Sequence, residues 1–163
     1  MRITYRQLAE RIQGEIPTLA QLVQRVLTGW SKVCQMPADD LYLDSVALNL
    51  HSFYSGIERI FELVAQRIDQ QSPKSQTWHR DLVWRMAEDV PTVRPAVISE
   101  RNALALDEFR RFRHLVRHTY TMQLVPEKIQ PLISNLETLW PALRAELLAF
   151  AAFLDVLAQG HDQ

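Results

Sequence analysis

The sequence is poor in glycine and cysteine. Its 163 residues include one cysteine and only four glycines, which are scattered at positions 14, 29, 56 and 160. Scattered glycines exclude a glycine-rich phosphate-binding loop. The single thiol, Cys34, cannot form a disulfide within the chain or build a cysteine-based metal site, so we expect it to be a small, buried or half-buried apolar residue.

Long apolar runs and an excess of one charge are absent as well. The net charge is −1, so any nucleic-acid binding must come from a local cluster of basic residues and not from the protein as a whole. The longest apolar stretch, residues 147–154, ends at Asp155 and is far shorter than the roughly 18 residues that span a membrane. The first 25 residues are interrupted by charges and lack the apolar core of a secretory signal. We therefore expect a cytoplasmic protein that does not contact membranes.

The apolar pattern predicts a single all-α domain over residues 1–163. Apolar residues recur at spacings of three and four, without strand alternation or internal repeats. Residues with high helix propensity are also abundant. We expect an up-and-down helical bundle of four to five helices. The predicted helices span residues 4–27, 38–69, 77–88, 100–120 and 126–157.

Glycine, proline and serine set the expected helix boundaries. Gly29 is expected to end the first helix, Pro37 to precede the second and Ser99 to cap the fourth. Gly56, inside the second helix, is expected to allow close approach of a neighbouring helix. The C-terminal residues 160–163 are expected to fray. Three prolines lie within predicted helices and are expected to bend or divide them: Pro17, Pro131 and Pro141.

Residues 109–120 form the most basic segment of the chain, with four arginines and two histidines and no acidic residue. On a helix, Arg110, Arg113, Arg117 and Tyr120 share a sector roughly 80° wide. The neighbouring sector can face the core. It carries Phe109, Phe112, Val116 and Thr119.

Such a basic stripe is usually solvated or paired with carboxylates. Asp107 and Glu108, just upstream, and Glu58 and Glu62, in the second helix, are the candidate partners.

The order of residues in this segment forms a specific motif. Arg113, His118 and Tyr120 read Arg-x4-His-x-Tyr, and the polar His114 directly follows the arginine. This pattern, near the end of the fourth helix, resembles the signature of HEPN domains and, with its final tyrosine, that of the HepT toxins. Residues 53–61 also resemble the corresponding earlier helix of the family.

The resemblance implies a HEPN-like bundle that acts as a metal-independent endoribonuclease toxin, with no cofactor. Arg113 and His118 would be its catalytic residues. A planar guanidinium can grip two phosphate oxygens, and an imidazole titrates near neutrality, so these side chains suit phosphodiester cleavage. Arg110, Arg117 and His114 would hold flanking RNA phosphates, and Arg111 would do so less directly.

The helix geometry and the resemblance both point to more than one chain. Side chains five residues apart on a helix point roughly 140° apart, so Arg113 and His118 of one chain converge poorly. The resemblance to HEPN ribonucleases implies a composite site in a cleft between two protomers. We therefore expect a homodimer or a higher even oligomer with an isologous interface. The resemblance also implies an MNT-type nucleotidyltransferase antitoxin as partner, which would attach AMP to Tyr120.

Two other function classes stay open from the sequence alone. One is a catalytically silent HEPN domain that binds a nucleotide or presents an antitoxin-binding surface. The other is a helical interaction module whose basic stripe docks on an acidic protein. The tryptophans at positions 30, 78, 84 and 140 are expected to anchor the core or an interface. No pair of histidines has metal-ligand spacing, so no metal site is expected.

Overall fold

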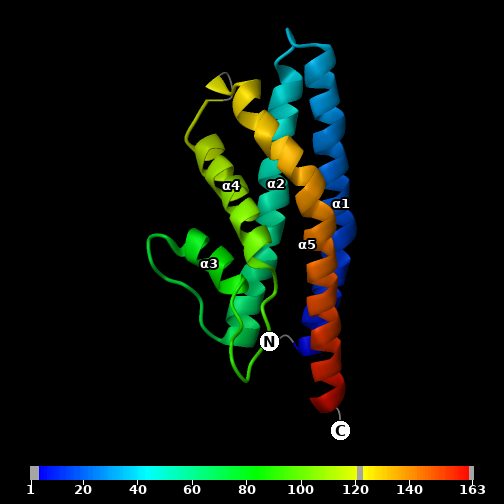
Figure 1. Cartoon of the computed structure of the whole chain (residues 1–163), viewed down its shortest axis with the longest axis vertical. Helices are drawn as coiled ribbons and strands as arrows, with labels where there is room; N and C mark the ends of the chain where they lie inside the picture. The colour runs from blue at the N-terminus through cyan, green and yellow to red at the C-terminus, as the bar shows by residue number, and fades with distance from the viewer. Residues whose placement is uncertain (1–3, 121–122, 162–163) are drawn as a thin grey trace.

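The protein folds as an all-α bundle, as predicted (Figure 1). The computed structural model describes residues 4–120 and 123–161, and no strand occurs within them. The elements are α1 (Tyr5–Gln35), α2 (Leu41–Val64), the π-turn η1 (Ala65–Asp69), α3 (Trp78–Met86), α4 (Glu100–Arg117) and α5 (Pro126–His161). Helices α1, α2, α4 and α5 alternate in direction, and the short α3 lies at the side of the bundle against α2 and α4. None of the described helices has the length and apolar character to cross a bilayer.

Helix α1 is longer than the sequence predicted, because Gly29 packs inside it and does not end it. A Cβ atom at Gly29 would lie 2.9 Å from Cγ2 of Val46 on α2. The missing side chain therefore lets two helix backbones approach, and α1 continues without interruption to Gln35. Cys34, in the last turn, is exposed, which corrects the expectation that it is buried or half-buried.

Other boundaries also differ from the predicted ones. The residues after Pro37 form a turn, so α2 begins at Leu41. Helix α4 ends at Arg117, three residues before Tyr120. Helix α5 is not divided by its two prolines and includes residues 160 and 161, which were expected to fray. Residues 162 and 163 lie outside the described residues.

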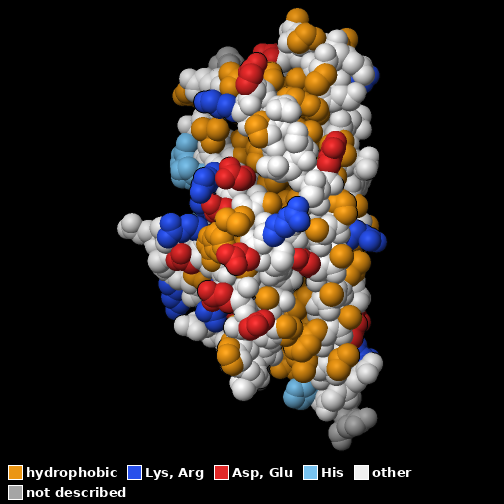
Figure 2. Space-filling model, in the orientation of Figure 1, with side chains coloured by type: hydrophobic (Ala, Val, Ile, Leu, Met, Phe, Trp, Pro, Cys, Tyr) orange, Lys and Arg blue, Asp and Glu red, His pale blue; other side chains and the backbone are white. Residues whose placement is uncertain are grey.

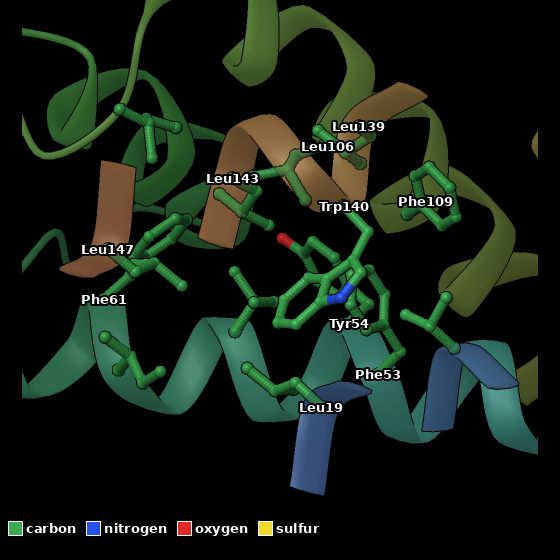
Figure 3. Packing of buried hydrophobic residues seen from close by; sticks show 14 of the residues in the cluster. Leu19, Phe53, Tyr54, Phe61, Leu106, Phe109, Leu139, Trp140, Leu143 and Leu147 are labelled. Atoms are coloured by element: carbon green, nitrogen blue, oxygen red, sulfur yellow. The ribbon is translucent and has the colours of Figure 1, made fainter. Parts of the chain in front are cut away.

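Helix α2 forms the centre of the core. The Phe53 ring on α2 makes edge contacts with Phe109 of α4 at 6.0 Å and Trp140 of α5 at 5.8 Å between ring centroids (Figure 3). On its α1 side, Gly56 would place a Cβ atom 3.0 Å from Cδ2 of Leu19, so the predicted close helix approach is confirmed. Burying each such aromatic ring contributes on the order of 2–3 kcal/mol, and this packing fixes α4 relative to α2.

The segment that leads into α4 is anchored by a fully buried arginine. Arg94 donates to both Asp69 carboxylate oxygens, at 2.6 and 2.9 Å, and to the backbone oxygens of Glu88, Pro95 and Arg85. All five N–H groups of this guanidinium are satisfied, as a buried charge requires. The pair ties the start of α4 to the end of α2.

The glycine contacts predict opposite effects for one substitution at two places in α1. Gly29→Ala gains helix propensity but must displace the buried, rigid Val46, so the free energy of unfolding should fall by about 1 kcal/mol. Gly14→Ala, where nothing lies within 4 Å of the new Cβ, should raise it by about 0.5–1 kcal/mol. Urea denaturation of both variants checks this. Stabilisation by both substitutions would contradict the close approach at Gly29.

Candidate active site

The core contacts of α4 set the direction of every side chain in its basic segment. Phe109 and Phe112 are buried, and Val116 and Thr119 are half-buried, so the predicted inward sector is confirmed. Arg113 then points sideways toward α2. The residues near the end of α4 point to solvent, and Figure 2 shows histidine side chains beside basic ones at the edge of the molecule over this part of α4.

Arg113 is held in place by α2. Its Nε–H donates to Oγ of Ser55 at 3.1 Å, and the side chain is half-buried. Neither terminal Nη group has a hydrogen-bond partner among the described residues, and no carboxylate in that part of the chain lies within ion-pair distance. The guanidinium is therefore fixed at one edge while its terminal fork stays available to a ligand.

His118 lies at the end of α4, where the helix stops. Its backbone N–H still donates to the Leu115 carbonyl at 3.1 Å, but its own backbone has left the helical conformation. The exposed ring lies 4.5 Å from that of His114, centroid to centroid. No contact joins His118 to Arg113 among the described residues, so one chain does not bring the two motif residues together.

The other arginines of the segment differ in their partners. Arg110 donates to Asp107 at 2.7 Å, and Arg111 pairs with the same carboxylate at 3.0 Å and with Glu108 at 3.5 Å. Asp107 and Glu108 are thus partners of the basic stripe, as the sequence suggested. Arg117 is exposed and has no ion pair among the described residues. The uncompensated positive charge is concentrated at the C-terminal end of α4.

The α2 face opposite Arg113 carries His51, Ser55, Glu58 and Glu62, one helical turn apart. Burial and the positive charges of Arg113 and Arg117 lower the pKa of His51 below its ordinary value of 6.5, against an opposing effect of Glu58.

Burial and the nearby Glu58 raise the pKa of Glu62, and the charges of His79, Arg113 and Arg59 oppose this rise. The positive charge of Arg113 thus acts on both His51 and Glu62, at the two ends of this α2 face. Glu58 and Glu62 were anticipated as partners of the basic stripe, but neither forms an ion pair with it among the described residues, and Glu58 pairs with His79 instead. His51 and Ser55 were missed, because nothing in their local sequence marks them.

Tyr120 lies three residues beyond the end of α4, in the connection to α5. Tyr120 is 75% exposed to solvent. The described residues include no group of three or more His, Cys, Asp or Glu side chains that could hold a metal ion.

Comparison with known families decides the identity of this bundle. The model of a family described as HepT-like protein matches residues 45–154 of the chain. The chain belongs to the HepT-like family. No curated protein and no solved structure matches the chain.

The HepT-like match runs from α2 into the last third of α5. It therefore includes both helices that position Arg113, the Ser55 that binds it and the segment that carries His118 and Tyr120. The whole of α1 lies outside the match, on the side of the bundle away from α4.

The pKa of His51 gives a direct test of the electrostatics. An NMR titration should place the His51 midpoint below 6.5, and Arg113→Gln should move it upward because one charge that disfavours the imidazolium is removed. Arg144→Gln, on the exposed side of α5, should leave it unchanged. A wild-type midpoint at or above 6.5 would contradict the arrangement of Arg113 and Arg117 around this ring.

Proposed function

We propose that this HepT-like protein is a metal-independent endoribonuclease toxin whose activity resides in the Arg113-x4-His118-x-Tyr120 motif. The observation that carries the proposal is the state of Arg113, which is anchored through Nε while its two Nη groups have no partner among the described residues. A guanidinium so held offers two parallel hydrogen bonds to the phosphoryl oxygens of RNA, where negative charge grows in the transition state. Arg117, which is exposed and unpaired in the described part of the chain, and His114 would hold neighbouring phosphates.

His118 supplies the proton-transfer chemistry in this proposal. Cleavage by the ribose 2′-hydroxyl needs a proton removed from that group and a proton delivered to the leaving 5′-oxygen. An exposed imidazole can do either near neutral pH. Arg110 has a lesser part, because its Nε–H already binds Asp107.

A homodimer or a higher even oligomer would complete the site. His118 makes no contact with Arg113 of its own chain among the described residues, and it follows the end of α4, whose surface includes Leu104 and Leu115, 56% and 39% exposed. If a second copy of the chain packed on this apolar face, His118 of the first copy would lie against the surface of the second. An isologous contact repeats that arrangement twice.

Tyr120 is the proposed point of control. An MNT-type nucleotidyltransferase partner would transfer AMP to its exposed hydroxyl. The added phosphate would neutralise arginines at the end of α4 and the adenosine would occupy the RNA path. The toxin would then be silent until unmodified protein is made.

Cleavage assays test the catalytic proposal. Wild-type protein should cleave RNA in the presence of EDTA, and Arg113→Ala and His118→Ala should each lower kcat/KM by roughly 10²–10⁴-fold. The control Arg144→Ala removes an exposed arginine from α5 and should retain full activity. A wild-type protein inert on varied RNAs, or motif variants as active as wild type, would refute the enzyme and leave a silent binding module.

The same two variants test whether the site is shared between protomers. Unfolding and refolding an equal mixture should restore roughly a quarter of wild-type activity, because half of the dimers then contain one intact composite site of two. Restoration to no more than the sum of the separate variants would place the whole site within one chain.

Modification of Tyr120 has its own readout. Incubation with an MNT-type nucleotidyltransferase and ATP should add AMP units to the wild-type mass and abolish RNA cleavage, whereas Tyr120→Phe should gain no mass and stay active. The Tyr42→Phe control, at a half-buried position on α2, should be modified as wild type is. Equal mass gain by Tyr120→Phe would assign the modification to another residue.

A further inference from the structure

A carboxylate–imidazole pair lies beside Arg113 and plays no part in the motif. Nδ1 of His79, on α3, is 2.8 Å from Oε2 of Glu58 on α2. The Glu58 side chain is 7% exposed and that of His79 is 32% exposed. The His79 ring is also stacked on Trp78, with 3.5 Å between ring centroids. The imidazole is thus fixed by a hydrogen bond at one nitrogen and by an aromatic face.

The orientation leaves the second ring nitrogen available. When the Glu58 carboxylate accepts from Nδ1–H, the neutral ring carries its lone pair on Nε2. Nε2 has no hydrogen-bond partner among the described residues and is not among the buried atoms that lack one. It therefore reaches solvent as a proton acceptor of fixed direction, as in a serine-hydrolase triad, where a buried carboxylate orients the histidine base.

The pair lies close to the proposed phosphate site. Ser55, which anchors Arg113, and Glu58 are three residues apart on one face of α2, about 4.5 Å along the helix axis. Arg113 is bound to Ser55 and His79 is bound to Glu58, so the guanidinium and the imidazole are held by neighbouring turns of α2.

We propose that His79, oriented by Glu58, is the general base of RNA cleavage, an inference that rests on the proposed function. Nε2 of His79 takes the proton of the ribose 2′-hydroxyl, and the 2′-oxygen forms a bond to the phosphorus held by Arg113. The bond from phosphorus to the 5′-oxygen breaks, and protonated His118 of the second protomer donates its proton to that oxygen. The products are a 2′,3′-cyclic phosphate and a 5′-hydroxyl, and no other reactant is consumed.

The variant His79→Asn separates this role from the docking of α3. The asparagine amide nitrogen occupies the place of Nδ1 and keeps a donor toward Glu58, but nothing replaces Nε2. We expect an unchanged melting temperature and KM, and a fall in kcat of roughly 10²–10⁴-fold. His161→Asn, the same substitution near the end of α5, should have wild-type kcat. Glu58→Gln, which keeps an acceptor but removes the charge, should lower kcat by less and leave KM unchanged, as expected for a positioning residue.

The choice of substrate distinguishes a base from an acid. RNA with sulfur in place of the leaving 5′-oxygen needs no proton at the leaving group. His118→Asn should recover activity on this substrate, whereas His79→Asn should stay slow. Recovery by His79→Asn would overturn its assignment as the base.

A measurement on the wild-type protein keeps the proposal testable if the His79 variant unfolds. Bound RNA with a 2′-O-methyl group at the scissile nucleotide should protect His79 from diethylpyrocarbonate, while exposed His161 stays reactive. Absence of protection would overturn the proposal. If wild type cleaves RNA and Arg113→Ala does not, but His79→Asn retains full kcat, the base assignment fails and the proposed function stands. If wild type cleaves no RNA, both fail.

Discussion

The hydrogen bond from Arg113 to Ser55 is the contact on which the rest of the site depends. A surface arginine loses roughly 2 kcal/mol of rotamer entropy when it is fixed. In this protein, part of that entropy is already lost when the chain folds, because Nε of Arg113 donates to Oγ of Ser55 on α2 at 3.1 Å. Less entropy then remains to be lost when a ligand binds. The bond exists only because Phe53 and Phe109 hold α2 and α4 together. The core packing thus positions a guanidinium whose terminal groups have no partner in the described chain.

The electrostatics around this guanidinium are balanced and not uniformly positive. On one side lie His51, whose pKa is lowered, and exposed Arg117. On the other lie Glu58, engaged by His79, and Glu62, whose pKa is raised. Within the described residues, positive charge without a partner is concentrated at the C-terminal end of α4, so the proposed phosphodiester site lies there. A chain of net charge −1 thus still carries a local basic cluster, which is what the proposed binding of RNA requires.

The sequence predicted the helical architecture well, because helix periodicity is a local signal. The sequence-based prediction was wrong where tertiary contacts determine the structure. Gly29 reads as a helix end in isolation, but the approach of Val46 makes it an interior packing residue. The motif residues Arg113 and His118 were predicted from their spacing in the sequence and from the family resemblance, and their role stays a prediction. Ser55 and the Glu58–His79 pair were not found as a site, because 58 and 21 residues separate the partners and only the fold brings them together.

The structure of the protein bound to RNA that carries a 2′-O-methyl group at the scissile position tests the central claim most directly. That group blocks the attacking oxygen, so the intact phosphodiester should remain in the site. The account predicts its non-bridging oxygens within hydrogen-bond distance of Nη1 and Nη2 of Arg113, with Nε still bound to Ser55. A phosphodiester bound elsewhere on the bundle, with Arg113 making no contact to RNA, would contradict it.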